Sequence, residues 1–542
     1  MSGPTCSSQR FPLEPAHPVV ARDSTLFVAG DRFTYPALER IETGFTHFVT
    51  AADLDAALKT SRAASAQWRS SASESSELRI AILGTSSAAG CGAAEDVRGA
   101  GKEDSRRPGS DLFRFDKWGR LTAGLDQTCL IERSWGRHLA DYLSRHLPSA
   151  SPTVHIAAKN AVPASFFSRC TSRHLYSNPH VVLLDVLTNF FDGNDQTLVS
   201  LVEAVRRAAP TAAIAFVMWP SQYQLKSGVR SGKVQKMLAA AAQTGVDALR
   251  VDLVLRVLSS RGLALSIGER GPFKLYAQRN ADQVHPSPLG HQLLGAIAAR
   301  FVAKRLADAA CQKHAHEPSA SPGLSEAPLL WERCFDVADR MPVQLSGSWR
   351  LVDEGGAKGV RKLGYLSTAV GDTLRIGPLQ GPPSLSCALL RVTLGYKLSA
   401  SRSGQGKFNV TCTGCSCARM HSRQERYDFY PFPYVDTDAR EARNSDVLKA
   451  NATITAETEF FLLWRPMCFL DVLHLERERT PMQQRNRPTR IRIDSLSLTQ
   501  TDQELLSEVR SSAKPSTEPI KRIRALRVYR LLNQSIECAE NS

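Results

Sequence analysis

The chain has 542 residues, of which 42% are hydrophobic and 22% charged, and its formal net charge is +15 at pH 7. This composition is typical of folded globular proteins and excludes a wholly disordered, collagen-like or disulfide-scaffold protein. The Lys and Arg residues are scattered, so the charge favours a diffuse positive surface over a site for nucleic acid, anionic polysaccharide or a membrane. We therefore expect no nucleic-acid partner, and a chain of this length should form two or three domains.

Residues 1–75 are predicted to form an N-terminal leader that is partly helical or disordered, with one helical stretch near 51–66. The leader has no apolar run typical of a signal peptide, and no apolar stretch of about 18 residues predicts a transmembrane segment. Clustered cysteines in the C-terminal half and three N-x-S/T sequons point instead to the secretory pathway, so the compartment stays open. The sequons lie at Asn409, Asn451 and Asn533.

The stretch 76–310 alternates short apolar runs with amphipathic helical patterns. The apolar runs cover 78–83, 153–158, 181–187, 212–218 and 247–255. The helical patterns cover 135–147, 197–209, 230–245 and 290–309. Continuous apolar strands between amphipathic helices predict an α/β domain whose parallel sheet is covered by helices on both faces.

The rest of the chain has a different rhythm. Residues 311–328 have the composition of a linker. From 329 to 500, short alternating segments separated by Gly, Pro and Ser predict an antiparallel β-sandwich or jelly-roll-like domain. The tail, 501–542, is polar and carries a basic amphipathic helical run over 520–532.

The first apolar strand of the α/β region runs into a Gly- and Ser-rich turn over 82–93, which we expect to lead into a helix. There a serine hydroxyl can attack a carbonyl carbon, while the helix N-terminus and an adjacent backbone N–H stabilise the oxyanion. Ser86 is the candidate nucleophile, and the glycines allow a sharp bend close to a substrate. A purely structural Gly/Ser turn is the alternative.

Asp282 and His285 form a second candidate pair in a loop just before the last predicted helix. A carboxylate so close in the chain can hold the imidazole in one tautomer and stabilise the imidazolium. His285 could then act as general base for a serine hydroxyl. The alternative is a solvent-exposed helix cap.

Two further segments follow predicted strands. Asn189 lies just past the apolar run 181–187, where its side-chain amide could donate to an oxyanion. A turn Asn is the alternative. The segment 155–167 runs from a strand into a helix start, whose backbone N–H groups could add another donor.

These four segments, in this order, resemble the blocks of the SGNH (GDSL-like) hydrolase superfamily over about 78–307. The resemblance implies a flavodoxin-like α/β domain with its active-site loops at the carboxyl ends of the strands. It implies a Ser-His-Asp triad with Ser86 as nucleophile, beside the similar Ser87, and with His285 and Asp282 as the other members. No metal or organic cofactor is implied.

The resemblance also implies an oxyanion hole made by the backbone N–H groups of Ser86 and Ala164 and the side-chain amide of Asn189. Three positions depart from the family pattern. Thr85 stands where the family has Asp, Ala164 where it has Gly, and Phe190 where it has Asp. Because Thr85 replaces a residue outside the family's triad, its change need not abolish the chemistry.

The predicted function is that of a serine esterase that hydrolyses carboxylic esters through an acyl-enzyme, with an O-acetylated carbohydrate as the preferred substrate. That substrate rests on the pairing of an esterase domain with a β-rich domain, which is an argument by analogy. The alternatives are a catalytically degenerate relative that binds a glycan or a protein, and an O-acyltransferase. The acyl group, the alcohol partner and the oligomeric state are not predicted.

Three cysteines lie close together in the pattern Cys412-x-x-Cys415-x-Cys417. A zinc site normally needs a second pair of ligands, and His421 is the nearby candidate. Zinc binding, disulfide bonds and free structural thiols remain as three interpretations of this cluster.

Overall fold

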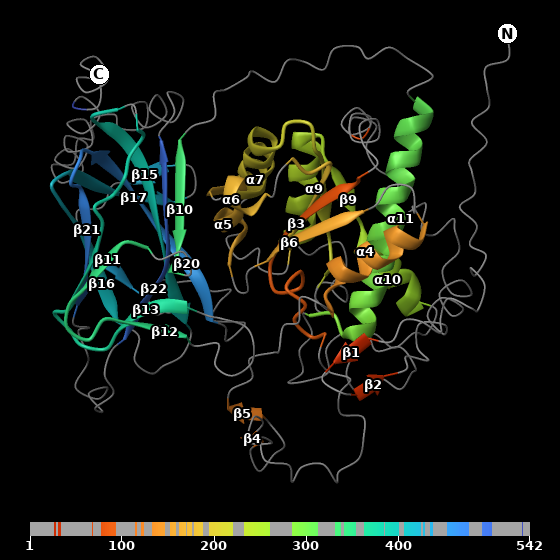
Figure 1. Cartoon of the computed structure of the whole chain (residues 1–542), viewed down its shortest axis with the longest axis horizontal. Coiled ribbons are helices and arrows are strands. Elements are labelled where there is room, and N and C mark those ends of the chain that lie inside the picture. The colour runs from red at the N-terminus through yellow and green to blue at the C-terminus, as the bar shows by residue number, and fades with distance from the viewer. Residues whose placement is uncertain are drawn as a thin grey trace. The chain divides into compact units, whose positions relative to one another are not determined.

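The computed structural model divides the chain into two compact units (Figure 1). The first comprises Met1–Asn160 and Leu175–Leu324, and the second comprises Ala161–His174 and Ser325–Ser542. The described residues are 26–28, 31–33, 68, 77–93, 114–115, 121–123, 133–146, 152–158, 162–169, 171–175, 178–187, 195–220, 232–260, 285–312, 331–337, 341–353, 363–383, 385–399, 406–423, 426–428, 434–436, 453–475, 490–500 and 534.

The first unit is built on a five-stranded parallel sheet. In spatial order its strands are β6 (Thr153–Ala158), β3 (Arg79–Gly84), β7 (Val181–Asp185), β8 (Ala213–Val217) and β9 (Asp247–Leu249). The central strands β7 and β8 are buried along their whole length, as continuous apolar runs predict. From β3 the chain adds β6 on one side of the sheet and then β7, β8 and β9 on the other. The carboxyl ends of β3 and β7 are therefore the switch point at which flavodoxin-like folds bind ligands.

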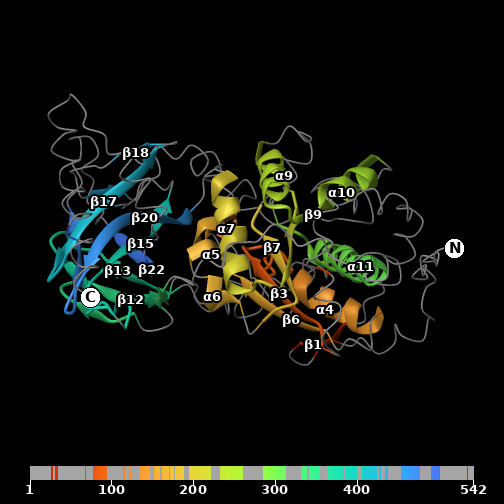
Figure 2. The same cartoon turned by 90° about the horizontal axis from the view of Figure 1, so that it is seen from above.

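Helices cover both faces of this sheet, and Figure 2 shows the two layers. One face carries α4 (Trp135–His146), α10 (Val251–Ser260) and α11 (Pro288–Gln312). The other carries α7 (Asp195–Ala208) and α9 (Gly232–Thr244). The predicted α/β fold is therefore confirmed.

A glycine allows α4 and α11 to cross closely. A Cβ atom on Gly295 of α11 would lie 2.5 Å from His138 Cβ and 2.8 Å from the Trp135 carbonyl oxygen of α4. Any side chain at this position would therefore push the two helices apart. This close crossing brings the start of α11 against the start of α4.

The apolar run 247–255 divides into the short strand β9 and the helix α10. Val251, Val254 and Leu255 are all buried, and their spacing of three and four residues matches one face of a helix rather than a strand. Asp252 lies in the first turn of α10 and pairs with Arg250, with 2.7 Å between Oδ1 and Nε. A carboxylate at this end favours the helix start.

Part of the predicted leader belongs to the core of the first unit. Trp68 keeps 1% of its surface exposed and packs edge-on against Phe301 of α11, with ring centroids 5.8 Å apart. Its indole Nε1 donates to Asp247 Oδ2 at 2.8 Å. The described parts of the N-terminal region also include two hairpins, β1 (Leu26–Val28) with β2 (Asp31–Phe33) and β4 (Arg114–Phe115) with β5 (Leu121–Ala123).

The second unit consists mainly of two antiparallel sheets. The larger one contains β12 (Arg350–Asp353), β13 (Leu363–Ser367), β22 (Ile491–Gln500), β15 (Ala388–Ser399), β20 (Thr453–Trp464), β17 (Ser416–Arg423) and β18 (Arg426–Asp428), with β10 (Glu332–Asp336) also paired to β22. The smaller one contains β11 (Val343–Leu345), β14 (Thr373–Ile376), β21 (Phe469–Leu475), β16 (Lys407–Thr413) and β19 (Tyr434–Asp436).

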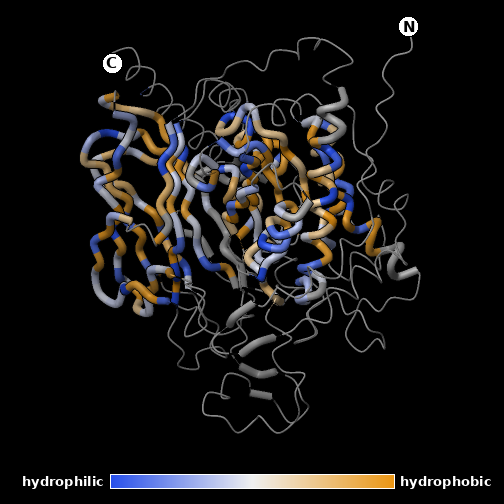
Figure 3. Tube along the Cα trace, turned by 45° about the vertical axis from the view of Figure 1, so that its right-hand side comes forward, coloured by the Kyte–Doolittle hydropathy of each residue, from blue (hydrophilic) through white to orange (hydrophobic). Residues whose placement is uncertain are grey.

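The two sheets pack face to face as a sandwich. Tyr396 of β15 and Phe408 of β16 meet edge-on across them, with ring centroids 5.3 Å apart. Leu390, Val392 and Leu394 are fully buried at every second position of β15. Figure 3 shows hydrophobic residues concentrated along the strands of both units. The predicted antiparallel domain is confirmed.

The segment Ala161–His174 groups with this second unit although it lies within the range predicted for the α/β domain. It forms α5 (Ala164–Arg169) and α6 (Thr171–His174). The Cys334 Sγ atom of β10 lies 3.3 Å from the Arg169 carbonyl oxygen, and Ser172 Oγ donates to Glu332 Oε2 at 3.1 Å. These contacts fix the two short helices against β10.

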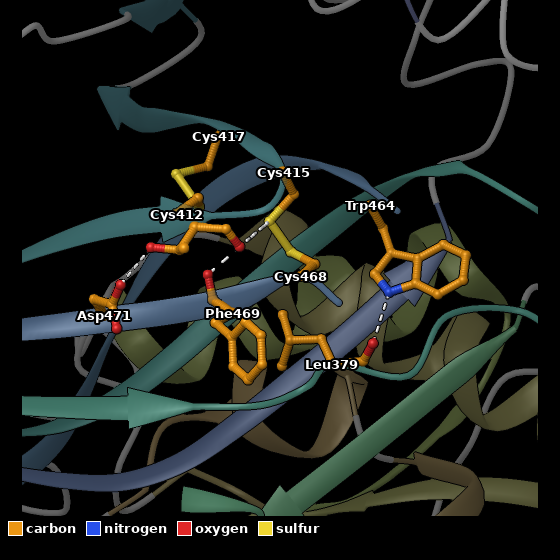
Figure 4. The surroundings of a disulfide bond; sticks show 9 residues. Leu379, Cys412, Cys415, Cys417, Trp464, Cys468, Phe469 and Asp471 are labelled. Atoms are coloured by element: carbon orange, nitrogen blue, oxygen red, sulfur yellow. Dashed lines mark hydrogen bonds between the residues drawn. A yellow bond between two sulfur atoms is a disulfide. The ribbon is translucent and has the colours of Figure 1, made fainter. Parts of the chain in front are cut away.

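The cysteine cluster forms disulfide bonds (Figure 4). Cys412 pairs with Cys417, and Cys415 pairs with Cys468, the residue just before β21. Among the described residues, no group of three or more His, Cys, Asp or Glu side chains is placed to hold a metal ion. Disulfides are therefore the correct one of the three interpretations, and they tie the turn after β16 to both neighbouring strands.

Several predictions concern residues outside the described ones. These are the helix near 51–66, the linker beyond Gln312, the sequons at Asn451 and Asn533, and the basic helical run 520–532. Of the helices in the described ranges, none is both long enough and apolar enough to cross a membrane.

Candidate active site

The two candidate catalytic residues that the structure describes are in direct contact. His285 Nε2 lies 2.7 Å from Ser86 Oγ, although the two residues are far apart in the chain. Ser86 follows β3 and His285 precedes α11, so the contact lies at the carboxyl end of β3, next to the switch point of the sheet. Ser86 keeps 7% of its surface exposed, and His285 is half-buried.

The chain after β3 forms a series of tight turns rather than the predicted helix. The Ala89 N–H donates to the Thr85 carbonyl oxygen and the Cys91 N–H to that of Ser86, both at 3.0 Å. Gly90 and Gly92 have φ values of 77° and 91°, which only glycine adopts without strain. Because residues 85–93 contain no helix, no helix dipole within that stretch acts on Ser86.

A glycine also lets this turn fold back on the sheet. A Cβ atom on Gly84 would lie 2.3 Å from Ala88 Cβ and 3.2 Å from Asp185 Cβ. The turn therefore lies directly against the end of β7. Close packing, and not only the sharp bend, therefore requires a glycine at position 84.

His285 is held by the cap of α11. Ser287 Oγ accepts from the Gly290 N–H at 3.0 Å, which is the N-cap bond of a helix whose first residue is Pro288. The predicted helix start at Gly290 is therefore two residues late. Since a capped helix end is rigid, His285, two residues before the cap, is held near Ser86.

His291 is a buried residue that the sequence analysis missed. Its Nδ1 accepts from the Trp135 backbone N–H at 3.2 Å, and its Nε2 contacts the Cys91 carbonyl oxygen at 3.0 Å. This pattern requires the neutral ring with its proton on Nε2. Burial lowers the pKa of His291 to about 3. The neutral imidazole thus joins α11, α4 and the nucleophile turn.

Asp185, the last residue of β7, is a second buried group that was missed. Its Oδ2 accepts from Ser87 Oγ at 2.8 Å and from the Trp135 indole Nε1 at 2.9 Å. Its carbonyl oxygen accepts from the Thr85 N–H at 3.0 Å. Burial raises the pKa of Asp185 to about 6, against the opposing effects of Ser87, Trp135 and the charge of His285.

The other predicted site residues are Asp282, Asn189 and Ala164. Asp282 and Asn189 lie outside the described residues. Ala164 is buried at the start of α5, which groups with the second unit. Their parts in the triad and the oxyanion hole therefore stay predictions.

The positions beside Ser86 are both buried and both bonded to Asp185. Thr85, which replaces the family's Asp, is fully buried, and its Oγ1 lies 3.4 Å from the Asp185 carbonyl oxygen. Ser87 is also fully buried, and its hydroxyl is bonded to Asp185. Of the two neighbouring serines, Ser86 is thus the one in contact with the histidine.

A second Ser, His and Asp grouping occurs in the sandwich, with a different geometry. Ser367 Oγ lies 2.9 Å from His474 Nδ1, and both residues are fully buried. The Asp372 carbonyl oxygen, not its carboxylate, accepts from the His474 N–H at 3.0 Å. The Asp372 carboxylate instead accepts from the Ser348 N–H at 2.6 Å. These bonds join neighbouring turns and strands, and the serine is shielded from solvent.

No protein-family model and no curated protein sequence matches the chain. Among solved structures, a two-domain esterase active on acetylated mannans is 14% identical, with a TM-score of 0.47, over 80% of this chain and 93% of that one. A family two carbohydrate esterase from Clostridium thermocellum, solved as an active-site mutant, is 15% identical, with a TM-score of 0.27, over 42% and 64%. TesA is 17% identical, with a TM-score of 0.25, over 42% and 98%.

The first unit is thus a five-stranded parallel sheet with helices on both faces, joined in the same chain to a second unit of antiparallel sheets. The predicted flavodoxin-like strand order is confirmed by the sheet itself. The contact between Ser86 and His285 is the feature of this chain that bears on chemistry.

Proposed function

We propose that the protein is a serine esterase in which Ser86 is the nucleophile and His285 the general base. The observation that carries the proposal is the 2.7 Å distance between Ser86 Oγ and His285 Nε2. This is the hydrogen-bond reach that proton transfer from a hydroxyl to an imidazole requires. Asp282, three residues before His285, is proposed to orient the imidazole through Nδ1.

The proposed reaction is acyl transfer in two steps. Ser86 Oγ forms a bond to the ester carbonyl carbon while His285 takes its proton, and the bond to the alcohol oxygen then breaks as His285 returns the proton to it. Water next attacks the acyl-enzyme by the same route and releases the acid. The Ser86 N–H, the Ala164 N–H and the Asn189 amide are the proposed donors to the oxyanion.

The proposed substrate class is an O-acetylated carbohydrate. Its support is the presence of a β-sandwich in the same chain as an esterase-type α/β unit, an argument from architecture. If a sugar hydroxyl takes the place of water in the second step, the same residues would catalyse O-acyl transfer.

A non-catalytic glycan- or protein-binding relative is the rival. The observation that favours it is the low exposure of Ser86, at 7%. Access to the hydroxyl therefore decides between the two, and the test must include a probe of serine reactivity.

The first test is hydrolysis of a chromogenic acetate ester by the full chain, with Ser86→Ala beside it. We expect turnover by the wild type and its loss in Ser86→Ala. Ser144→Ala is the matched control, because Ser144 is an exposed serine of α4 whose hydroxyl bonds only to its own helix among the described contacts.

Labelling with a fluorophosphonate, followed by peptide mass spectrometry, tests access separately. Modification of Ser86 rather than Ser87 is expected. A folded wild type that neither hydrolyses the ester nor reacts with the probe would exclude the esterase and leave the binder. If both tests succeed, release of acetate from acetylated mannan, with acetylated protein as comparison, then tests the substrate class.

A further inference from the structure

A single residue, Asp185, is hydrogen-bonded to the chain on both sides of the nucleophile. The Asp185 carbonyl oxygen bonds the backbone of Thr85, and its Oδ2 bonds the side chain of Ser87. Asp185 and Gly84 are also partners in the register of β7 and β3. Ser86 therefore lies between two residues that are both hydrogen-bonded to Asp185.

The second oxygen of this carboxylate is unusual. Asp185 Oδ1 is buried and has no hydrogen-bond partner among the described residues. Buried carboxylate oxygens are normally paired, because a desolvated charge without partners is unfavourable. Purely structural anchoring would not need an acid with one unpaired oxygen at the carboxyl end of the central strand, next to the switch point.

We infer that Asp185 is a positioning residue, a second carboxylate that fixes the nucleophile turn through Ser87 and electrostatically favours the imidazolium that His285 becomes. The inference rests on the proposed function, because it assigns Asp185 a part in that reaction. The triad needs a positive charge on His285 at the moment Ser86 attacks. A buried negative charge nearby stabilises that state more than it would in water.

The electrostatics of the surroundings agree with this assignment. The charge of His285 opposes the burial that raises the pKa of Asp185, so the two groups interact. Other ionisable groups on the two helices packed here include His291 of α11 and His138, Arg137 and Asp141 of α4. His291 is neutral, because burial lowers its pKa to about 3. Arg137 and Asp141 pair with each other, at 3.4 Å.

The test compares two buried aspartates of the same unit. Asp185→Asn keeps the shape of the side chain and removes its charge, and Asp247→Asn does the same at a carboxylate that lies in the core beside Trp68. We would measure kcat and KM for the chromogenic ester from pH 4 to 9, together with thermal unfolding. For Asp185→Asn we expect kcat to fall at least about tenfold with little change in KM.

The pH profile separates positioning from simple structural support. Without the negative charge, protonation of His285 is less favourable, so the acid limb of kcat/KM should move to lower pH in Asp185→Asn. Asp247→Asn should keep kcat and the limb while it lowers the unfolding temperature. A fall in kcat for Asp185→Asn with an unmoved limb would overturn the inference.

A second variant covers failure of Asp185→Asn to fold. Ser87→Ala removes one donor to Oδ2, which raises the pKa of the Asp185 carboxyl. Because full activity in this proposal needs that carboxyl in its ionised form, the acid limb of kcat/KM should then move to higher pH. An unmoved limb in Ser87→Ala would count against the inference in the same way. Lack of turnover in the wild type would overturn the proposed function and the inference with it, whereas normal turnover with unmoved limbs overturns the inference alone.

Discussion

Two buried aspartates on the same sheet, each bonded to a tryptophan, differ in what surrounds them. Asp247 begins β9, and its two oxygens accept from Trp68 Nε1 at 2.8 Å and from the Arg305 guanidinium at 2.7 Å. Asp185 ends β7, and one oxygen accepts from both the Trp135 indole and Ser87. Asp247 thus has a buried counter-charge, and Asp185 has only neutral donors among its described partners.

The comparison teaches that a buried acid is defined by its partners rather than by its burial. The guanidinium neutralises Asp247, so this cluster joins the N-terminal region, β9 and α11 into one core. The neutral donors leave Asp185 with a raised pKa, of about 6, next to the contact between Ser86 and His285. We therefore expect changes near Asp185 to alter activity and changes near Asp247 to alter stability.

The largest expected effect is on activity, at His285. His285→Gln removes the base from Ser86, so kcat for the chromogenic ester should fall by about a thousandfold or more. The thermal unfolding midpoint should stay close to that of the wild type, since His285 is half-buried and precedes the helix cap. Steady-state kinetics and calorimetry would check both quantities. A variant that keeps full activity would contradict the expectation that changes near Asp185 and Ser86 alter activity.

The next effect is on stability, at the other cluster. Trp68→Ala removes a fully buried indole and its bond to Asp247, so the free energy of unfolding should fall by about 3–5 kcal/mol. Urea unfolding of the full chain measures this change. Trp68→Phe is the control, because it keeps most of the packing and loses the hydrogen bond. Equal urea midpoints for Trp68→Ala and wild type would mean that the N-terminal region does not contribute to this core.

The sequence predicted those parts of the fold and site that depend on local pattern. Apolar runs and helical periods placed the sheet and most of its helices, and the family-like blocks singled out Ser86 and His285. The two buried ionisable groups were missed for a physical reason, since each sits inside an element that was interpreted only by its apolar period. An acid within the otherwise apolar strand of Asp185 was nevertheless a signal, because such residues are almost never buried without a partner.

Other features depend on contacts distant in sequence. Trp68 lies in an Ala- and Ser-rich stretch with no pattern of its own, and only the structure brings it to Asp247 and Phe301. In the same way, the local spacing of the cysteine cluster could not reveal that Cys415 pairs with Cys468. Local spacing also could not show that the turn after Gly84 continues as turns instead of a helix, since its bonds depend on glycines with positive φ.

The smallest effect expected is a balance in the pH dependence of stability. His291 has a pKa of about 3 in the fold, below its ordinary 6.5. As the pH is lowered through this range, the unfolded chain therefore takes up a proton before the folded chain does, and the free energy of unfolding decreases. Asp185 has a pKa of about 6 in the fold, above its ordinary 3.8, so the folded chain binds the proton first and stability rises as pH falls. Between about pH 4 and 6 the two contributions oppose each other.

Removing either group should make the contribution of the other to the pH dependence of stability measurable. Asp185→Asn leaves the His291 contribution alone, so the free energy of unfolding should decline more steeply between pH 7 and pH 4.5 than in the wild type. His291→Gln leaves the Asp185 contribution alone, so the decline should be shallower. Urea unfolding at the two pH values measures the difference within each protein, which cancels the loss that each substitution causes at neutral pH. Parallel slopes in all three proteins would show that neither group changes its protonation on folding, and the contrast between the two aspartates would then lose its electrostatic basis.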